Sequence, residues 1–428
     1  MDINGVDSFT VKVINKVVVH ADEPWTDHWL PFTNFDLLVP PFDAGSTFFY
    51  KKPSHGSFQT TVSTLKASLP RVLALFEPLA GQIAWNKDAG ENQIHCNNHG
   101  VEFIEAVADV ELKELNLYNP DECIDGKLMP KKVVRGVLVI QVTKLKCEGI
   151  VIGVMSDHRV VDGYSANMFI SSWADITRSI TPSMIPSFGR SYLQPRSPTV
   201  YSPLIHNVFA VFEPSSNPDS RLSEEKEEEE DAYKLVNRIY YIKGEQLKNL
   251  QLLASQNGCR RSKLVSFTSF LWKEVALSME DSGKHHEACN VVVSVDGRRR
   301  LGEGEGEEKE KLMASHFGNV LSMPYGSKKS QPRPLISKAF VGGEMSFSVS
   351  AGQRFETMEE IDFGWGKVTF GSCHIPSERK DCFVMPMGSP INNEDWIVYT
   401  HMPRKHMNYI EAHAGHIFKP LNANYLNI

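Results

Sequence analysis

Apolar residues recur along this chain in two patterns. Some segments alternate apolar with polar residues or contain runs of β-branched residues, as strands do, and others place apolar residues at the spacing of a helix face. Residues 150–155 form a short β-branched run that is typical of a buried strand. Residues 164–176 carry apolar side chains at helical spacing, and residues 58–76 do so despite Pro70. The first half is therefore predicted to hold strands at 9–20, 131–145 and 149–155 and helices at 58–76 and 164–176.

The second half repeats this alternation of strands and helices, which predicts two units of similar element content. Residues 301–311, LGEGEGEEKEK, are acidic and glycine-rich, so we expect a loop there. Residues 28–41 mix strand-forming residues with prolines, which favours an interrupted strand. The predicted strands of the second half are 236–242, 290–295, 319–323, 367–373, 381–385 and 396–401, and the predicted helices are 245–257, 262–279, 333–350 and 404–418.

The two predicted units are separated by a stretch of different composition. A segment rich in proline and serine precedes the run PSSNPDSRLSEEKEEEED at 214–231. A block of like charges repels itself and stays solvated, so this run predicts a linker more than a functional acidic tail. A chain of 428 residues also exceeds the usual size of one core. We therefore expect an N-terminal domain at 1–190, a crossover linker at 191–231 and a C-terminal domain at 232–428.

Charge and the N-terminal residues narrow the possible partners and location. The formal net charge is −7, so no overall basic field attracts nucleic acid or an anionic membrane. The first twenty residues lack the basic start and continuous apolar run of a secretory signal. No stretch of eighteen apolar residues occurs in the sequence. These patterns predict a soluble, cytoplasmic protein without nucleic-acid partners or membrane insertion.

The cysteines and the C-terminal histidines do not predict a metal site. The seven cysteines are scattered, odd in number and form no C-x-x-C pair, so we interpret them as reduced and mostly structural. His413 and His416 are three residues apart, but no adjacent set of carboxylates completes a plausible ligand set. The sequence therefore predicts no bound metal.

His158 and Asp162 lie between the predicted strand 149–155 and the helix 164–176. A histidine where a strand runs into a loop is placed like a general base, although a hydrogen-bonded core histidine is the simpler interpretation. Asp162 is well placed to cap the helix. It could equally anchor the loop by pairing with a buried arginine, and Arg298, Arg299 and Arg300 follow a predicted strand.

Two further segments combine glycine with aromatic residues. Residues 362–366, DFGWG, predict a sharp turn before a strand, and a structural role is favoured because Asp362 is the one proton carrier there. Residues 76–82, FEPLAGQ, are interpreted as a packing corner that leads into another strand.

These segments together resemble the plant BAHD acyltransferases. HRVVDG at 158–163, VDGRRR at 295–300 and DFGWG at 362–366 have the order and spacing of that family, and FEPLAGQ is similar to its YPLAGR segment. The resemblance spans essentially the whole chain. It implies an α/β fold of two chloramphenicol-acetyltransferase-like domains, each a mixed sheet flanked by helices, with a channel between them.

The resemblance also implies roles for individual residues. His158 matches the base that takes a proton from an acceptor hydroxyl or amine as it attacks the thioester of acyl-CoA. Asp162 matches the structural aspartate that pairs with an arginine, for which Arg298 is the first choice and Arg300 the second. Asp362, Gly364, Trp365 and Gly366 match a motif that shapes the channel. Acyl-CoA is then a co-substrate, and no permanently bound cofactor is expected.

Coenzyme A carries phosphates, which an acidic protein must bind at a local basic site. Arg261, Ser262 and Lys263 lie where a predicted helix begins, so cations, backbone amides and the helix dipole would converge there. A solvated basic turn is the alternative interpretation. No GxSxG elbow or reactive-cysteine context occurs, so we expect direct transfer in a ternary complex without an acyl-enzyme.

The acceptor is less well indicated than the reaction. Members that use shikimate or quinate tend to carry arginine after DFGWG, where this chain has Lys367, and anthocyanin-acylating members carry YFGN where it has HFGN at 316–319. Residues 28–53 look similar to coniferyl alcohol acyltransferases. We therefore expect a monomeric enzyme of plant phenylpropanoid metabolism that acylates an alcohol. The alternatives are an amine acceptor and a non-catalytic binding member; a peptide-forming condensation domain is disfavoured because Asp157 precedes His158.

Overall fold

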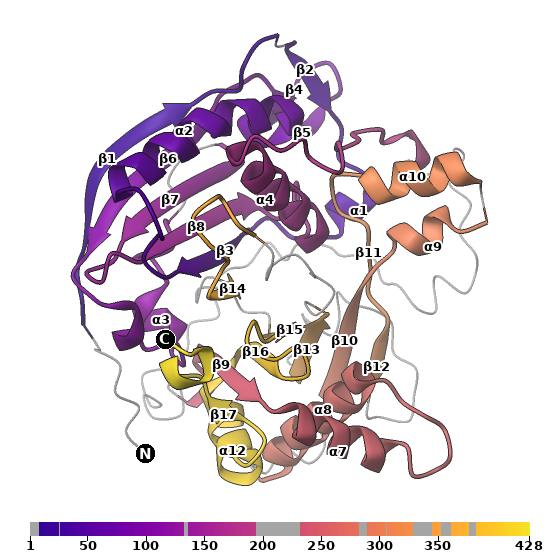
Figure 1. Cartoon of the computed structure of the whole chain (residues 1–428). Coiled ribbons are helices and arrows are strands. Elements are labelled where there is room, and N and C mark those ends of the chain that lie inside the picture. The colour runs from indigo at the N-terminus through magenta and orange to yellow at the C-terminus, as the bar shows by residue number, and fades with distance from the viewer. Residues whose placement is uncertain are drawn as a thin grey trace, which may run out of the picture.

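The computed structural model describes residues 8–24, 26–131, 136–193, 232–281, 289–304, 306–327, 345–351, 361–375 and 382–428. Two large sheets organise these residues, one in each half of the molecule, and helices pack on the sheets (Figure 1). The fold is thus a mixed α/β structure of two sheet-containing units, as the sequence predicts. No helix in these ranges combines the length and the apolar character that crossing a membrane requires.

The first sheet has six strands in the order β1-β6-β7-β8-β3-β14. β6 and β7 are parallel, and all other neighbours in the sheet are antiparallel. β8 is buried along its whole length, which agrees with its continuous apolar sequence. The strands are β1 Val11–Val19, β3 Asp43–Tyr50, β6 Val101–Ala108, β7 Leu138–Lys144, β8 Ile150–Asp157 and β14 Phe370–His374.

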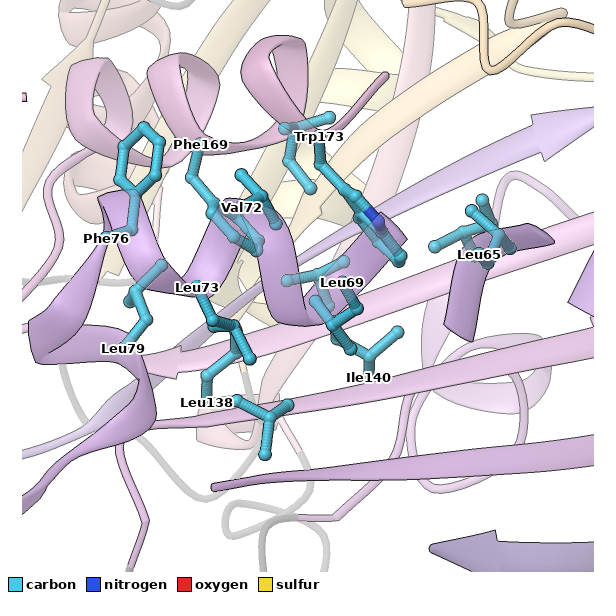
Figure 2. Close-up of a cluster of buried hydrophobic side chains, with 14 of the residues drawn as sticks. Leu65, Leu69, Val72, Leu73, Phe76, Leu79, Leu138, Ile140, Phe169 and Trp173 are labelled. Atoms are coloured by element: carbon cyan, nitrogen blue, oxygen red, sulfur yellow. The ribbon is translucent and has the colours of Figure 1, made fainter. Parts of the chain in front are cut away.

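Helices α2 (Phe58–Leu75) and α4 (Gly163–Thr177) pack in one apolar cluster with this sheet. Figure 2 shows α2 between α4 and the strands, with Leu69, Leu73, Leu138 and Ile140 among the side chains that fill the contact. The indole of Trp173 joins the two helices because its N–H donates to Ser68 Oγ at 2.9 Å. A rigid two-helix layer therefore supports the strand that leads to His158.

A small sheet of three strands includes β4, which directly follows the predicted packing corner. The corner folds as η1 (Glu77–Ala80), in which Leu79 and Ala80 are buried. Gly81 follows, and a Cβ there would come within 2.5 Å of the His95 carbonyl oxygen, so the close approach requires glycine. The strands are β2 His28–Leu30, β4 Gln82–Asn86 and β5 Glu91–Cys96.

The second sheet has eight strands, with the path β11-β10-β13-β15-β16-β9-β17 and β12 paired to β10. Helices α7 (Gly244–Ala254), α8 (Lys263–Asp281) and α12 (Arg404–Ala414) contribute to the apolar cluster on this sheet. The strands are β9 Leu235–Ile242, β10 Cys289–Asp296, β11 Leu321–Ser322, β12 Tyr325–Ser327, β13 Met345–Ser350, β15 Cys382–Gly388, β16 Trp396–Pro403 and β17 Lys419–Pro420.

The two sheets are joined by more than one kind of contact. A second apolar cluster contains side chains of both, such as Phe49 and Met155 from the first and Tyr399 from the second. β14 comes from the C-terminal half of the chain but pairs with β3 in the first sheet. Sheet membership therefore does not follow the proposed division at 190 and 232. The remaining short elements are α1 Asn34–Leu37, η2 Leu112–Glu114, α3 Pro120–Cys123, η3 Ser191–Leu193, α9 Arg298–Gly302, α10 Glu307–Ser315 and η5 Ala423–Leu426.

Several predicted elements differ from the structure. The expected loop at 301–311 contains parts of α9 and α10, because the glutamates of 307–310 stabilise a helix N-terminus. Residues 345–350 form β13 where a helix was expected, and 333–344 lie outside the described residues. β3, β5 and β6 were not predicted. Residues 194–231, which include nearly all of the expected linker, also lie outside the described residues.

Candidate active site

His158 directly follows the end of β8, an inner strand of the first sheet. Its backbone N–H donates to the Phe42 carbonyl at 2.9 Å, which continues the pairing of β8 with β3 by one residue. Its imidazole lies 4.9 Å from the Phe42 ring, measured between ring centroids. His158 is partly exposed, whereas all of β8 before it is buried. A partly exposed imidazole on a rigid strand end has the placement that proton transfer requires.

Asp162 caps helix α4 and is fully engaged by hydrogen bonds. Its Oδ1 accepts from the Ser165 N–H at 2.8 Å, which satisfies one of the free amides of the first turn. Its Oδ2 accepts from the Val320 N–H at 3.2 Å. The carboxylate is 1% exposed and therefore needs a cation or several donors to remain charged. The capping interpretation and the pairing interpretation of Asp162 hold together.

Arg298 supplies the cation from the first residue of α9. Its Nη1 and Nη2 donate to the two oxygens of Asp162 at 2.8 and 3.1 Å, a bidentate pair. Arg298 also donates to Gly318 and His316 carbonyls, at 2.8 and 3.1 Å, and its guanidinium lies 4.4 Å from the Tyr164 ring centroid. We call Asp162, Arg298 and Ser165, whose hydroxyl accepts from Arg298 at 3.1 Å, the polar clamp.

The polar clamp fixes the charge state of its members. Burial alone would raise the pKa of the Asp162 carboxyl, but Arg298 and the Ser165 donors lower it below its ordinary value. Burial would lower the pKa of Arg298, and Asp162 and Asp296 raise it instead. Asp162 is thus an ionised acceptor whose oxygens are occupied. It is suited to hold the loop and not to carry a proton.

Residues 316–320 pass between the polar clamp and the loop after β8. The Asn319 side-chain amide donates to the carbonyls of His158 and Arg159, at 2.9 and 3.0 Å. Burial lowers the pKa of His316 to about 4, and the nearby Arg298 and Arg190 add to the effect, so its imidazole is neutral near pH 7. Sequence reasoning used HFGN only to compare subgroups and missed that Asn319 contacts the candidate base.

The DFGWG turn lies away from the 158–162 loop, near the start of β8. Trp365 stacks on Phe363 at 5.4 Å and meets Tyr50 edge-on at 6.0 Å, while Phe363 packs on Trp173 near the C-terminal end of α4. Tyr50 pairs with Ile150, at the start of β8. Seven further residues at ~3.3 Å each put the start of β8 about 23 Å from its end near His158. The structure thus joins Arg298 to Asp162, in the loop that begins at His158, whereas Trp365 lies near the opposite end of β8.

The turn itself is built by Asp362 and the two glycines. Asp362 Oδ1 accepts from the Gly364 and Gly366 amides, at 2.7 and 3.1 Å. Gly364 and Gly366 have φ of 106° and 129°, values that favour glycine. The turn aims Phe363 and Trp365 into the core below α4, which agrees with a structural role.

The residues expected to bind coenzyme A lie at the start of α8, on the second sheet (Figure 1). The Ser262 hydroxyl accepts from the Val265 N–H at 3.2 Å and caps the helix. Lys263 Nζ lies 3.6 Å from Glu394, which Lys248 also contacts at 2.7 Å. Arg261 is exposed. Part of the positive charge at this helix start is therefore already matched by a carboxylate.

No group of three or more histidine, cysteine, aspartate or glutamate residues in the described ranges is arranged to hold a metal ion. Four thiols, those of Cys96, Cys123, Cys373 and Cys382, have their pKa raised by burial, to about 12 for Cys96, Cys123 and Cys382. A thiol that stays protonated is a poor nucleophile.

Comparisons with known proteins identify relatives of this chain and structures that share its fold. The model of the family described as Transferase family matches residues 9–342 and 329–417. A hydroxycinnamoyltransferase of Narcissus pseudonarcissus is 30% identical over 320 residues, which cover 73% of this chain and 69% of that protein. A shikimate O-hydroxycinnamoyltransferase of Nicotiana tabacum is 24% identical over 452 residues, covering 94% and 98%. The crystal structure of vinorine synthase superposes with a TM-score of 0.72 at 18% identity, covering 97% of this chain and 100% of that one.

Proposed function

This chain belongs to the Transferase family, the BAHD acyl-CoA-dependent acyltransferases, and we propose that it transfers an acyl group to the hydroxyl of a phenylpropanoid alcohol. His158 is the general base in this proposal. One observation carries the assignment: His158 is a partly exposed imidazole at the end of a buried strand, in a loop that ends at Asp162, whose carboxylate Arg298 holds ionised.

The proposed reaction is a direct transfer. His158 accepts the proton of the acceptor hydroxyl while the oxygen attacks the thioester carbonyl carbon of acyl-CoA. The tetrahedral intermediate collapses, the carbon–sulfur bond breaks, and the departing thiolate of coenzyme A takes the proton from the imidazolium. The ester is released with free coenzyme A, and the enzyme returns to its starting state. The raised pKa values of Cys96, Cys123, Cys373 and Cys382 argue against an acyl-cysteine intermediate at these four thiols.

The names of two relatives support a hydroxycinnamoyl donor for this chain. We infer an aromatic alcohol such as coniferyl alcohol as acceptor, because residues 28–53 resemble enzymes that acylate it. Lys367 replaces the arginine that shikimate- or quinate-using members tend to carry after DFGWG, which argues against those acceptors. An amine acceptor is the alternative outcome of the assay.

Phosphates of coenzyme A would bind at Arg261, Ser262 and Lys263 in this proposal. Support comes from the N-terminus of the 19-residue helix α8 and the three polar side chains gathered there. A Lys263→Met variant is expected to raise the KM for acyl-CoA several-fold, measured at low and high salt because the contribution is electrostatic. An unchanged KM at both salt concentrations would remove this site from the proposal.

The function is tested by an end-point screen read by mass spectrometry. Coumaroyl-, feruloyl- and acetyl-CoA are incubated with coniferyl alcohol, shikimate or a polyamine, and ester or amide is quantified against free coenzyme A. We expect a hydroxycinnamoyl ester of coniferyl alcohol with one coenzyme A released per product. If product forms only with shikimate or only with the polyamine, that compound replaces coniferyl alcohol as the proposed acceptor.

The base is tested in the same assay by His158→Ala. General-base catalysis contributes about 10²–10⁴-fold, so kcat is expected to fall by that factor with an unchanged unfolding midpoint. Phe42→Leu is the control for packing around the imidazole and is expected to cost less than tenfold. Full turnover by His158→Ala would reject the assignment.

A further inference from the structure

A second buried ion pair lies beside the polar clamp and is formed by Asp36 and Arg190. Asp36 is fully buried in α1, and Arg190, which is 5% exposed, donates to its Oδ2. Thr33 also donates to that oxygen, from its N–H at 2.8 Å and its hydroxyl at 2.9 Å. The cation and the Thr33 donors thus replace the hydrogen bonds to water that this buried side chain loses.

The other oxygen of Asp36 binds Asn319. Asp36 Oδ1 accepts from the Asn319 backbone N–H at 2.9 Å and from its side-chain Nδ2 at 3.1 Å. The same Nδ2 donates to the carbonyls of His158 and Arg159. Asn319 is fully buried. A continuous hydrogen-bonded path therefore runs from Arg190 through Asp36 and Asn319 to the backbone of the candidate base.

Both polar groups of the His158 backbone are thus hydrogen-bonded. Its N–H donates to Phe42 O, and its carbonyl accepts from Asn319. Asp162, four residues later, accepts from the Val320 N–H. Two neighbouring residues of one segment, Asn319 and Val320, therefore fix the two ends of the 158–162 loop.

We propose that Asn319, oriented by the Asp36–Arg190 pair, is the positioning residue that sets the direction of the His158 imidazole. This inference rests on the proposed role of His158 as base. An amide is required at position 319 because the two N–H bonds of its NH₂ group are shared among three acceptors, the carbonyls of His158 and Arg159 and the Asp36 carboxylate. A carboxylate of the same shape would donate nothing and would face Asp36. The hydrogen-bonded path from Arg190 to His158 does not pass through the polar clamp, so a change at Asn319 should act on the base and leave the clamp intact.

The first test measures the imidazole directly and needs no substrate. Histidine is labelled with ¹³C at Cε1, and the His158 resonance is assigned as the one lost in His158→Ala. In Asn319→Asp and in the milder Asn319→Ser, we expect this resonance to shift or broaden into several conformers. An unchanged, sharp resonance in both folded variants would overturn the proposal, whatever the enzyme's substrate is.

The second test separates positioning from folding. A 1 Å misplacement of a catalytic group can cost about 100-fold, so we expect kcat of the folded fraction to fall by about that factor in Asn319→Ser with KM for acyl-CoA nearly unchanged. Asn237→Ser is the matched control, since Asn237 is also fully buried but lies on the second sheet, where its side chain binds Tyr399 of the same sheet and Asp121 of α3. We expect the control to lower the unfolding midpoint and to leave kcat unchanged.

A double variant sharpens the result. Asp36→Asn with Asn319→Asp keeps one carboxylate and one amide beside Arg190, so stability should recover relative to Asn319→Asp alone. The carboxylate at position 319 still has no N–H for the His158 carbonyl, so kcat should stay low. Recovery of kcat together with stability would reduce Asn319 to a structural role. Loss of turnover in His158→Ala with normal turnover in Asn319→Ser would reject positioning and leave the proposed base in place.

Discussion

The two ends of strand β8 are held by different forces. At the end near His158, the polar clamp and the Asp36–Arg190 pair hold a loop by charge-assisted hydrogen bonds, which have fixed directions. At the start of β8, Tyr50, Phe363 and Trp365 hold the DFGWG turn by ring packing. Ring contacts tolerate small shifts better than bidentate bonds do. The difference indicates that geometry is controlled closely at the His158 end and that burial suffices at the other.

Breaking the polar clamp is expected to have the largest effect. Arg298→Met removes the cation and leaves the buried Asp162 charge unpaired, which costs about 3–5 kcal/mol of unfolding free energy and should abolish turnover. Urea unfolding of the variant against wild type measures the loss. Arg300→Met, on an exposed arginine of the same helix, is the control and should change stability little. A variant within 1 kcal/mol of wild type (roughly the error of such comparisons) would show that the clamp is not needed for stability.

Acidification should lower the stability of the protein through His316, at the same end of β8 as the polar clamp. His316 has a folded pKa of about 4 against 6.5 in the unfolded chain, so between these values the unfolded chain binds the extra proton. Stability is therefore lost as the pH falls from 6.5 towards 4, by about 2 kcal/mol between pH 7 and pH 5. Asp162, whose pKa is lowered, contributes in the same direction only at more acidic pH.

Urea unfolding at pH 7 and pH 5 tests this expectation. The difference between the two pH values should shrink in His316→Gln, which cannot take up a proton there. An undiminished difference in that variant would assign the acid sensitivity to other groups.

The smallest effect is expected at the start of β8. Trp365→Phe keeps an aromatic ring against Tyr50 and Phe363 and should therefore lower the unfolding free energy by only about 1 kcal/mol. Trp365 also lies far from His158. The kcat and both KM values of the variant should match wild type. A hundredfold fall in kcat would mean that this end contributes to the reaction, and the contrast between the two ends would then fail.

Local sequence patterns were sufficient for the elements that carry His158. The apolar run of β8 and the helical spacing of α4 are contiguous, so the loop between them could be located. β5 was missed because ENQIHC is mostly polar and belongs to a small sheet with partial burial. α10 was missed because its one buried position, Met313, gives little amphipathic signal.

Contacts between distant residues could not be derived in the same way. Arg298 was chosen through a family resemblance, since three consecutive arginines offer the same chemistry. Along the chain, Asp36 lies 154 residues from Arg190 and 283 residues from Asn319. No local pattern encodes contacts over such separations. One signal was available: Asp36 lies in the apolar segment FDLLV, and a carboxylate in such surroundings is rarely buried without a partner.

The position of β14 in the first sheet has a consequence for how the chain is made. When residues 1–190 have been synthesised, β3 has β8 on one side but still lacks its other neighbour, because Phe370–His374 pairs with it from the opposite half of the chain. At about 5–20 residues per second, roughly ten to forty seconds pass before that strand exists. During this interval β3 has an open edge that can pair with other chains. The nascent protein should therefore depend most on chaperones midway through translation, and a fragment ending at residue 190 should aggregate.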